Sequence, residues 1–157
     1  MSELEWDPEI DIPYAVVWRW LNLSVHRYGS TPTGQTLAVL TIVLLSDLGY
    51  HPTVTELAEI TGLPKSTISR YVSFEMSAGF LEEYIDPADR RRRMLRPTAA
   101  AAAEREWHRG QIRQAYREIT AWHPGKGQMP VRVAKNLLDL LKGITAQNEA
   151  EAATRRD

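Results

Sequence analysis

The sequence predicts a mainly α-helical fold with one small β segment of two to three strands near its centre. Apolar residues recur at helical spacing through most of the 157 residues. Glycines and prolines divide the chain into segments of helical length. Two short runs of strand-forming residues, 81–85 and 94–96, flank an Asp-Pro-Ala-Asp turn at 86–89.

Composition excludes several classes of protein. The formal net charge is -1, and the absence of cysteine excludes disulfides, thiol nucleophiles and cysteine-based zinc sites. No apolar run approaches the roughly 20 residues that span a bilayer. The N-terminus is acidic, the reverse of a basic secretion leader. We therefore expect a cytoplasmic protein with no membrane partner.

The first third of the chain predicts two helices after an acidic tail at residues 1–12. Pro13 suits a first helical position, so the first helix is expected over Tyr14 to Tyr28, before a Gly-Ser-Thr-Pro break. A second, mostly buried helix is expected over Gln35 to Leu48, closed by Gly49.

A short capped helix and a tight turn follow. Thr53 is well placed as an N-cap, and Glu56 three residues later completes a capping box, in which each side chain satisfies a free backbone donor. Gly62 suits the C-terminal stop. The next helix is expected over 64–78, with three apolar residues at i, i+4 and i+8 pointing inward: Ile68, Val72 and Met76.

The opposite face of the 64–78 helix is polar and predicts contact with nucleic acid. It carries short hydroxyls and two cations: Lys65, Ser66, Thr67, Ser69, Arg70 and Ser73. Taken alone, such a face is equally typical of a solvated helix. The short helix and tight turn before it favour a helix–turn–helix, whose second helix enters the major groove of DNA. Arg70 has the geometry for paired hydrogen bonds to guanine.

Between the two predicted strands lies a cluster of four arginines, Arg90, Arg91, Arg92 and Arg93. Such a run is either a solvated turn or a contact with a polyanion. Adjacent cations repel each other, which favours a use for them, and DNA phosphate is the ligand they suit. Asp89 can hold one guanidinium by paired hydrogen bonds.

Two long helices are expected to close the chain. The first runs from an N-cap at Thr98 to about Trp122, and a loop at 123–129 leads to a helix over Val131 to about Glu151. The last helix carries an apolar stripe that is typical of pairing with another chain. Its members are Val133, Leu137, Leu140, Leu141 and Ile144.

The segment 53–98 resembles the winged helix–turn–helix of the MarR family of bacterial regulators. ELAEITGLPKSTISRYV is similar to that family's second helix, turn and recognition helix, and DRRRRMLRPT is similar to its wing. The sequence departs from the pattern at Glu75, where the family has leucine on the inward face, and at Pro97.

The resemblance implies a single domain over 1–157, with helices at 13–49 and 98–152 forming the core and a homodimer interface. It implies a cytoplasmic, nucleoid-associated repressor that binds a pseudo-palindromic site on double-stranded DNA. Asp89 would orient Arg91 into the minor groove. The family also binds small aromatic effectors, for which Trp18 and Trp20 are candidate cleft residues. The alternative is that these tryptophans fill the core.

No other chemistry is indicated by the sequence. The four histidines lack metal-ligand spacing, no catalytic set stands out, and no cofactor motif is present. We therefore expect neither an enzyme nor a metal site. Two alternatives to a sequence-specific regulator stay open: a winged-helix adaptor that binds a protein partner, and a nucleoid or replicon protein that binds DNA with little sequence preference.

Overall fold

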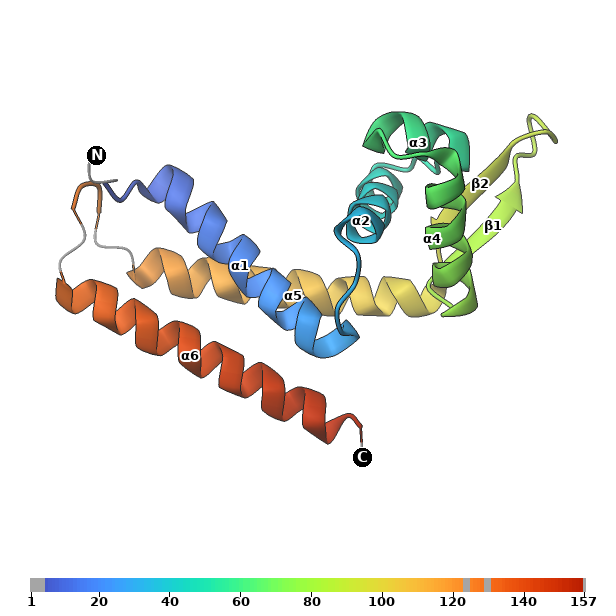
Figure 1. The fold of residues 1–157 in the computed structure, drawn as a ribbon. Coiled ribbons are helices and arrows are strands. Elements are labelled where there is room, and N and C mark those ends of the chain that lie inside the picture. Colours follow the sequence, from blue (N-terminus) through green and yellow to red (C-terminus); the bar gives the residue numbers. More distant parts are fainter. Residues whose placement is uncertain (1–4, 123–124, 129–130, 157) are drawn as a thin grey trace. The chain divides into compact units, whose positions relative to one another are not determined.

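The computed structural model describes residues 5–122, 125–128 and 131–156, and within them the chain is mainly α-helical with a two-stranded hairpin (Figure 1). In chain order the elements are α1 (Pro8–Tyr28), α2 (Thr33–Asp47), α3 (Val54–Thr61), α4 (Lys65–Ser77), β1 (Leu81–Ile85), β2 (Arg93–Pro97), α5 (Ala99–Trp122) and α6 (Val131–Thr154). The predicted fold class is therefore confirmed.

The chain divides into two compact units. The terminal unit comprises residues 1–30 and 108–157, with α1, most of α5 and α6. The central unit comprises residues 31–107, with α2, α3, α4, the hairpin and the start of α5. Helix α2 thus belongs with the predicted helix–turn–helix.

Helix α1 begins earlier than predicted. Asp7 is its N-cap and accepts a hydrogen bond from the Glu9 N–H at 3.1 Å, and Pro8 occupies the first helical position. Pro13 lies inside the helix. The prediction of an acidic tail over residues 1–12 is therefore wrong from Pro8 onward. Carboxylates in this segment favour the positively charged N-terminal end of a helix. The first four residues lie outside the described ones.

Helices α1 and α6 pack together within the terminal unit. Leu23 of α1 and Ile144 of α6 are buried. The Asn22 Nδ2 donates to Thr145 Oγ1 at 2.9 Å, and the Asn148 Nδ2 donates to Asn22 Oδ1 at 3.0 Å. At Ile144 the apolar stripe of α6 is thus buried within the chain itself. Among the predicted stripe residues, the side chain of Val133 lies outside the described part of the structure.

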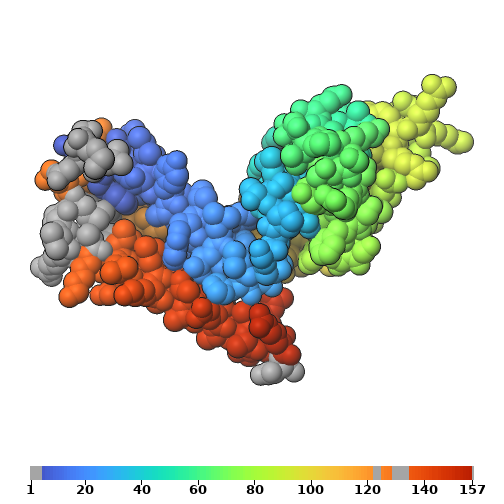
Figure 2. Space-filling model, in the orientation of Figure 1, coloured from blue at the N-terminus to red at the C-terminus, as the bar shows by residue number. Residues whose placement is uncertain are grey.

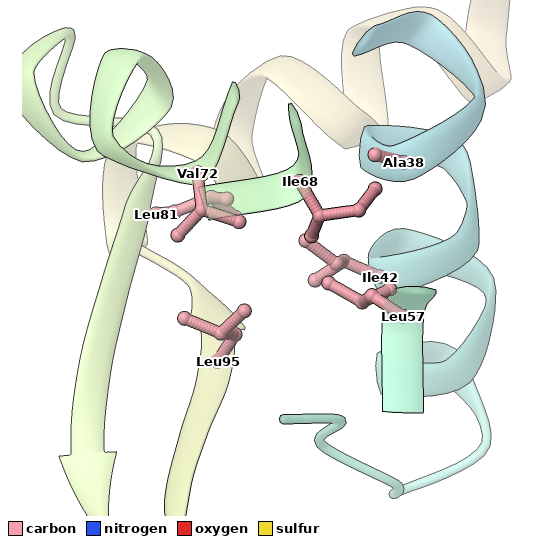
Figure 3. Packing of buried hydrophobic residues seen from close by; sticks show 7 residues of the cluster. All are labelled: Ala38, Ile42, Leu57, Ile68, Val72, Leu81 and Leu95. Atoms are coloured by element: carbon pink, nitrogen blue, oxygen red, sulfur yellow. The ribbon is translucent and has the colours of Figure 1, made fainter. Parts of the chain in front are cut away.

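The core of the central unit joins α2, α3, α4 and both strands. Its buried side chains are Ala38, Ile42, Leu57, Ile68, Val72, Leu81 and Leu95 (Figure 3). They hold the inner face of α4 against the other elements, which leaves the opposite face of that helix to solvent.

The inner face of α4 differs from the prediction at two positions. Met76 is 39% exposed. Steps of four residues turn a helix by about 400°, so the line from Ile68 through Val72 drifts away from the core by the third member. Glu75 lies nearer the core direction, where its Oε1 accepts a hydrogen bond from the Nε2 of buried Gln35 at 2.6 Å. The carboxylate thus has a polar partner in place of leucine packing.

Candidate nucleic-acid interface

The start of α3 carries the predicted capping box. The Glu56 N–H donates to Thr53 Oγ1 at 3.2 Å, and the Thr53 N–H donates to Glu56 Oε2 at 2.8 Å. Gly62 ends the helix in the left-handed region with φ 70°. The chain then turns directly into α4, whose N-cap is Pro64.

Helix α4 presents the predicted polar face. The side chains of Lys65, Ser66, Ser69, Arg70 and Ser73 are exposed and that of Thr67 is half-buried. The guanidinium of Arg70 lies 5.7 Å from the centre of the Tyr71 ring, at the edge of this face. Hydroxyls and a cation on an exposed helix surface are the groups that read base edges in a major groove.

The hairpin forms the wing beside α4. Its strands pair antiparallel, with Leu81 opposite Pro97 and Ile85 opposite Arg93. Leu81 and Leu95 are buried and fix the base of the hairpin to the core. The tip, residues 86–92, projects from the central unit (Figure 2).

Aspartates shape the turn at the wing tip. The Arg91 N–H donates to Asp89 Oδ1 at 3.0 Å, and the Arg92 N–H donates to the Asp89 backbone oxygen at 2.9 Å. The Asp86 N–H donates to the Arg92 backbone oxygen at 3.0 Å and closes the turn. Asp89 therefore contacts Arg91 through its backbone amide, whereas the sequence suggests a contact between Asp89 and a guanidinium.

The arginines of the wing fall into two groups. Arg92 pairs with Glu56 at 2.9 Å, and Arg93 pairs with Glu83 across the sheet at 2.9 Å. Arg90 and Arg91 are exposed and have no ion pair with any residue that the structure describes. At the wing tip, the charges of Arg90 and Arg91 therefore face solvent, and no carboxylate among the described residues is paired with them.

Glu56 is a functional candidate that sequence reasoning identified only as a helix cap. Its Oε1 accepts hydrogen bonds from Tyr50 Oη at 2.7 Å and from Arg92 Nη2 at 2.9 Å. Burial raises the pKa of Glu56, but the hydrogen bonds from Tyr50 and Thr53 and the charge of Arg92 outweigh it, so the pKa lies below its ordinary value. No pattern in the sequence indicates a contact between residues so far apart in the chain.

Of the two tryptophans predicted to line an effector cleft, only one lines a hollow in the structure. A hollow of about 10 Å³ in the terminal unit is lined by Trp20 but not by Trp18. Its lining residues are Arg19, Trp20, Leu23, Gln111, Ile112 and Asn148. That volume holds about one water molecule, whereas pockets for small organic ligands measure roughly 300 Å³ or more. The hollow therefore has no room for an aromatic effector.

Other kinds of site are not seen in the described part of the chain. Among those residues, no group of three or more His, Asp or Glu side chains is placed to hold a metal ion. The same residues include no helix that is both long and apolar enough to cross a membrane.

Comparisons with known proteins agree with this geometry. Residues 36–83 match the model of the IclR helix-turn-helix domain, a stretch that runs from α2 to β1 and covers less than half of the chain. A search of curated proteins found no match.

Solved structures of other proteins share the fold. RV1404 from Mycobacterium tuberculosis is 18% identical with a TM-score of 0.58, covering 89% of each chain. The transcriptional regulator Tm0710 from Thermotoga maritima is 22% identical with a TM-score of 0.53, covering 92% of this chain and 96% of its own. A mutant of MarR from E. coli is 19% identical with a TM-score of 0.50, covering 91% of this chain and 98% of its own.

The helix-turn-helix match and the winged-helix fold together support a DNA-binding transcription regulator. The segment that matches the domain model contains α4, the helix whose exposed polar face was described above.

Proposed function

We propose that this protein is a homodimeric, MarR-like transcriptional repressor that binds a pseudo-palindromic site on double-stranded DNA. The observation that carries the proposal lies within the central unit. One exposed helix face of hydroxyls and cations belongs to the same compact unit as a wing tip with two unpaired arginines. A major-groove helix with an adjacent arginine-bearing arm is a recurring arrangement for reading DNA.

Helix α4 would read bases. Arg70 is exposed and long enough for paired hydrogen bonds to guanine, a contact worth about 1–3 kcal/mol of discrimination against other bases. The hydroxyls of Ser66, Ser69 and Ser73 are short enough for close approach to base edges or phosphates.

The wing tip would contact the backbone and minor groove. Arg90 and Arg91 sit in a turn fixed by Asp89, so their backbone positions are set before DNA arrives. Each phosphate that such a cation neutralises adds about 0.9 to the salt slope of binding.

An exposed apolar stripe on α1 supports the homodimer. Its members are Ile10 (57% exposed), Tyr14 (73%), Val17 (52%), Leu21 (47%), Val25 (53%) and Tyr28 (41%). They recur at steps of three or four residues, so they share one face of the helix. A continuous apolar face of this length is typical of a helix that pairs with another chain. To contact successive half-sites, such a dimer needs its two α4 helices about one DNA turn apart.

Release from DNA would follow from a change in that spacing. A small aromatic effector or a protein partner that binds one spacing of the two α4 helices better shifts the equilibrium toward it. The free energy available for release equals the difference in affinity of that ligand for the two spacings.

The test is a selection of binding duplexes from a random pool, followed by fluorescence anisotropy on the selected duplex and on random DNA. Arg70→Ala should reduce the preference for the selected duplex by about 5- to 150-fold for each half-site, the factor that 1–3 kcal/mol per contact corresponds to. Arg91→Ala removes one arginine from each subunit of the dimer, so it should weaken binding to both duplexes and lower the salt slope by about 1.8, twice the value for one phosphate contact.

Arg113→Ala, which removes an exposed arginine from α5 in the terminal unit, is the matched control and should change neither quantity. Equal affinity of the wild type for selected and random DNA would favour the low-specificity DNA binder. Absence of binding would favour the adaptor that recognises a protein.

A further inference from the structure

Arg92 differs from the two exposed arginines beside it because its guanidinium reaches back to the helix–turn–helix. Its Nη2 lies 2.9 Å from Glu56 Oε1, at the start of α3, and its Nη1 lies 3.6 Å from Asp86 Oδ2. The side chain is 38% exposed and those of the two carboxylates 30% and 14%. The charge of Arg92 is thus paired with two carboxylates of its own chain.

Glu56 is a rigid attachment point. One oxygen accepts from Tyr50 Oη and Arg92, and the other accepts from the Thr53 N–H in the capping box. The adjacent residue Leu57 is fully buried in the core. A group bonded to this carboxylate is therefore held to the end of the first helix of the motif.

The backbone of Arg92 closes the turn at the wing tip. Its N–H donates to the Asp89 oxygen at 2.9 Å, and its carbonyl accepts from the Asp86 N–H at 3.0 Å. Arg90 and Arg91 lie between Asp89 and Arg92 in sequence, inside the turn that these two bonds close. Fixing Arg92 therefore fixes the turn that presents the two exposed cations.

We propose that Arg92 is a positioning residue that anchors the wing tip to the N-terminus of α3, and that only Arg90 and Arg91 of the four clustered arginines bring charge to DNA. The DNA half of this inference rests on the proposed function, while the anchoring half concerns the protein alone. The two halves predict different measurements.

The anchor is tested without DNA by amide hydrogen exchange of Asp86 and Arg92. Arg92→Met keeps an unbranched apolar stem and removes the guanidinium, and it should speed exchange at both amides by roughly 2- to 5-fold, the range expected for a partly exposed ion pair. Arg92→Lys should return exchange toward the wild-type rate. Arg93→Met, which breaks only the solvent-exposed pair with Glu83, is the matched control and should leave both amides unchanged.

Glu56→Gln gives a second, independent arm, because glutamine also serves in a capping box. If Arg92 acts through Glu56, adding Glu56→Gln to Arg92→Met should change exchange no further than either single substitution. Additive effects, or exchange in Arg92→Met equal to that of the wild type, would overturn the anchor even if the protein binds DNA tightly.

DNA binding tests the second half. On a selected duplex, Arg92→Met should lower affinity by roughly 2- to 5-fold at every salt concentration with an unchanged salt slope. Arg91→Met should instead lower the slope by about 1.8, because the dimer loses one phosphate contact at each of its two wing tips. A similar drop in slope for Arg92→Met would show that Arg92 contacts phosphate and would overturn the assignment. If the wild type does not bind DNA, the proposed function fails while the exchange result still decides the anchor.

Discussion

At the scale of single residues, the contact between Glu75 and Gln35 is a polar substitute for apolar packing under α4. The Gln35 side chain is 6% exposed, and its amide donates to Glu75 at 2.6 Å. Glu75→Ala leaves that buried amide without its acceptor and should lower the free energy of unfolding by about 1–3 kcal/mol in urea titrations.

Two comparisons make that prediction specific. Ser73→Ala, on the exposed face of the same helix, should stay within about 0.5 kcal/mol of the wild type. Replacing both Gln35 and Glu75 by leucine should recover most of the loss, because neither polar group is then stranded. A double variant as unstable as Glu75→Ala would show that the hydrogen bond is not what stabilises this site.

The sequence predicts which residues face outward on α4, but it does not predict which carboxylates form ion pairs with the arginines of the wing. Helical periodicity places Ser66, Arg70 and Ser73 on one side because 100° per residue is a fixed property of the helix. The partner of Arg92, in contrast, lies 36 residues away and depends on how the hairpin meets α3. A long, flexible side chain near several carboxylates has no sequence pattern that selects one of them.

At the scale of elements, the capping box of α3 makes the central unit sensitive to acid. Hydrogen bonds to the Glu56 carboxylate lower its pKa below the ordinary value of 4.5. The stabilisation is therefore present above about pH 4.5 and is lost as the pH falls through the lowered pKa. The stability difference between wild type and Glu56→Gln should shrink from pH 7 to pH 3 in urea titrations. A difference that is constant over this range would contradict the assignment.

The sequence predicts the ends of a helix correctly where capping residues mark them clearly. It misplaces an end where more than one position suits the start of the helix. Thr53, Glu56 and Gly62 fix both ends of α3 by backbone hydrogen bonding, and the structure confirms each of them. The start of α1 was misplaced because Pro8 and Pro13 both suit a first helical turn. The acidic residues before Pro13 match the positive end of a helix as well as they match a solvated tail.

At the scale of the whole molecule, the exposed stripe of α1 predicts where two copies meet. Leu21→Glu places a charge in the middle of that stripe and should convert a dimer into a monomer, measured by sedimentation equilibrium. Leu138→Glu makes the same change at a leucine of α6 that is 50% exposed, against 47% for Leu21, and should leave the dimer intact. Dissociation by Leu138→Glu alone would move the interface to α6.

The sequence predicts a pairing stripe on the last helix, and the resemblance places the dimer interface on helices at both ends of the chain, 13–49 and 98–152. Periodicity shows that a helix has an apolar stripe without showing what covers it. In the structure Ile144 of α6 is buried in the unit where α6 packs against α1, while α1 keeps a second apolar face exposed. Only the three-dimensional packing shows which apolar face is used within the chain and which face stays exposed.

The measurement that tests the central claim most directly is the salt dependence of DNA binding by the wild-type protein. Fluorescence anisotropy on a selected duplex would be recorded between 50 and 200 mM salt. Contacts from two α4 helices and two wing tips predict tight binding at 50 mM that falls by about 10³-fold or more at 200 mM. Absence of binding at 50 mM, or an affinity that does not change with salt, would contradict the proposal that the polar face of α4 and the arginine wing form a DNA-binding surface.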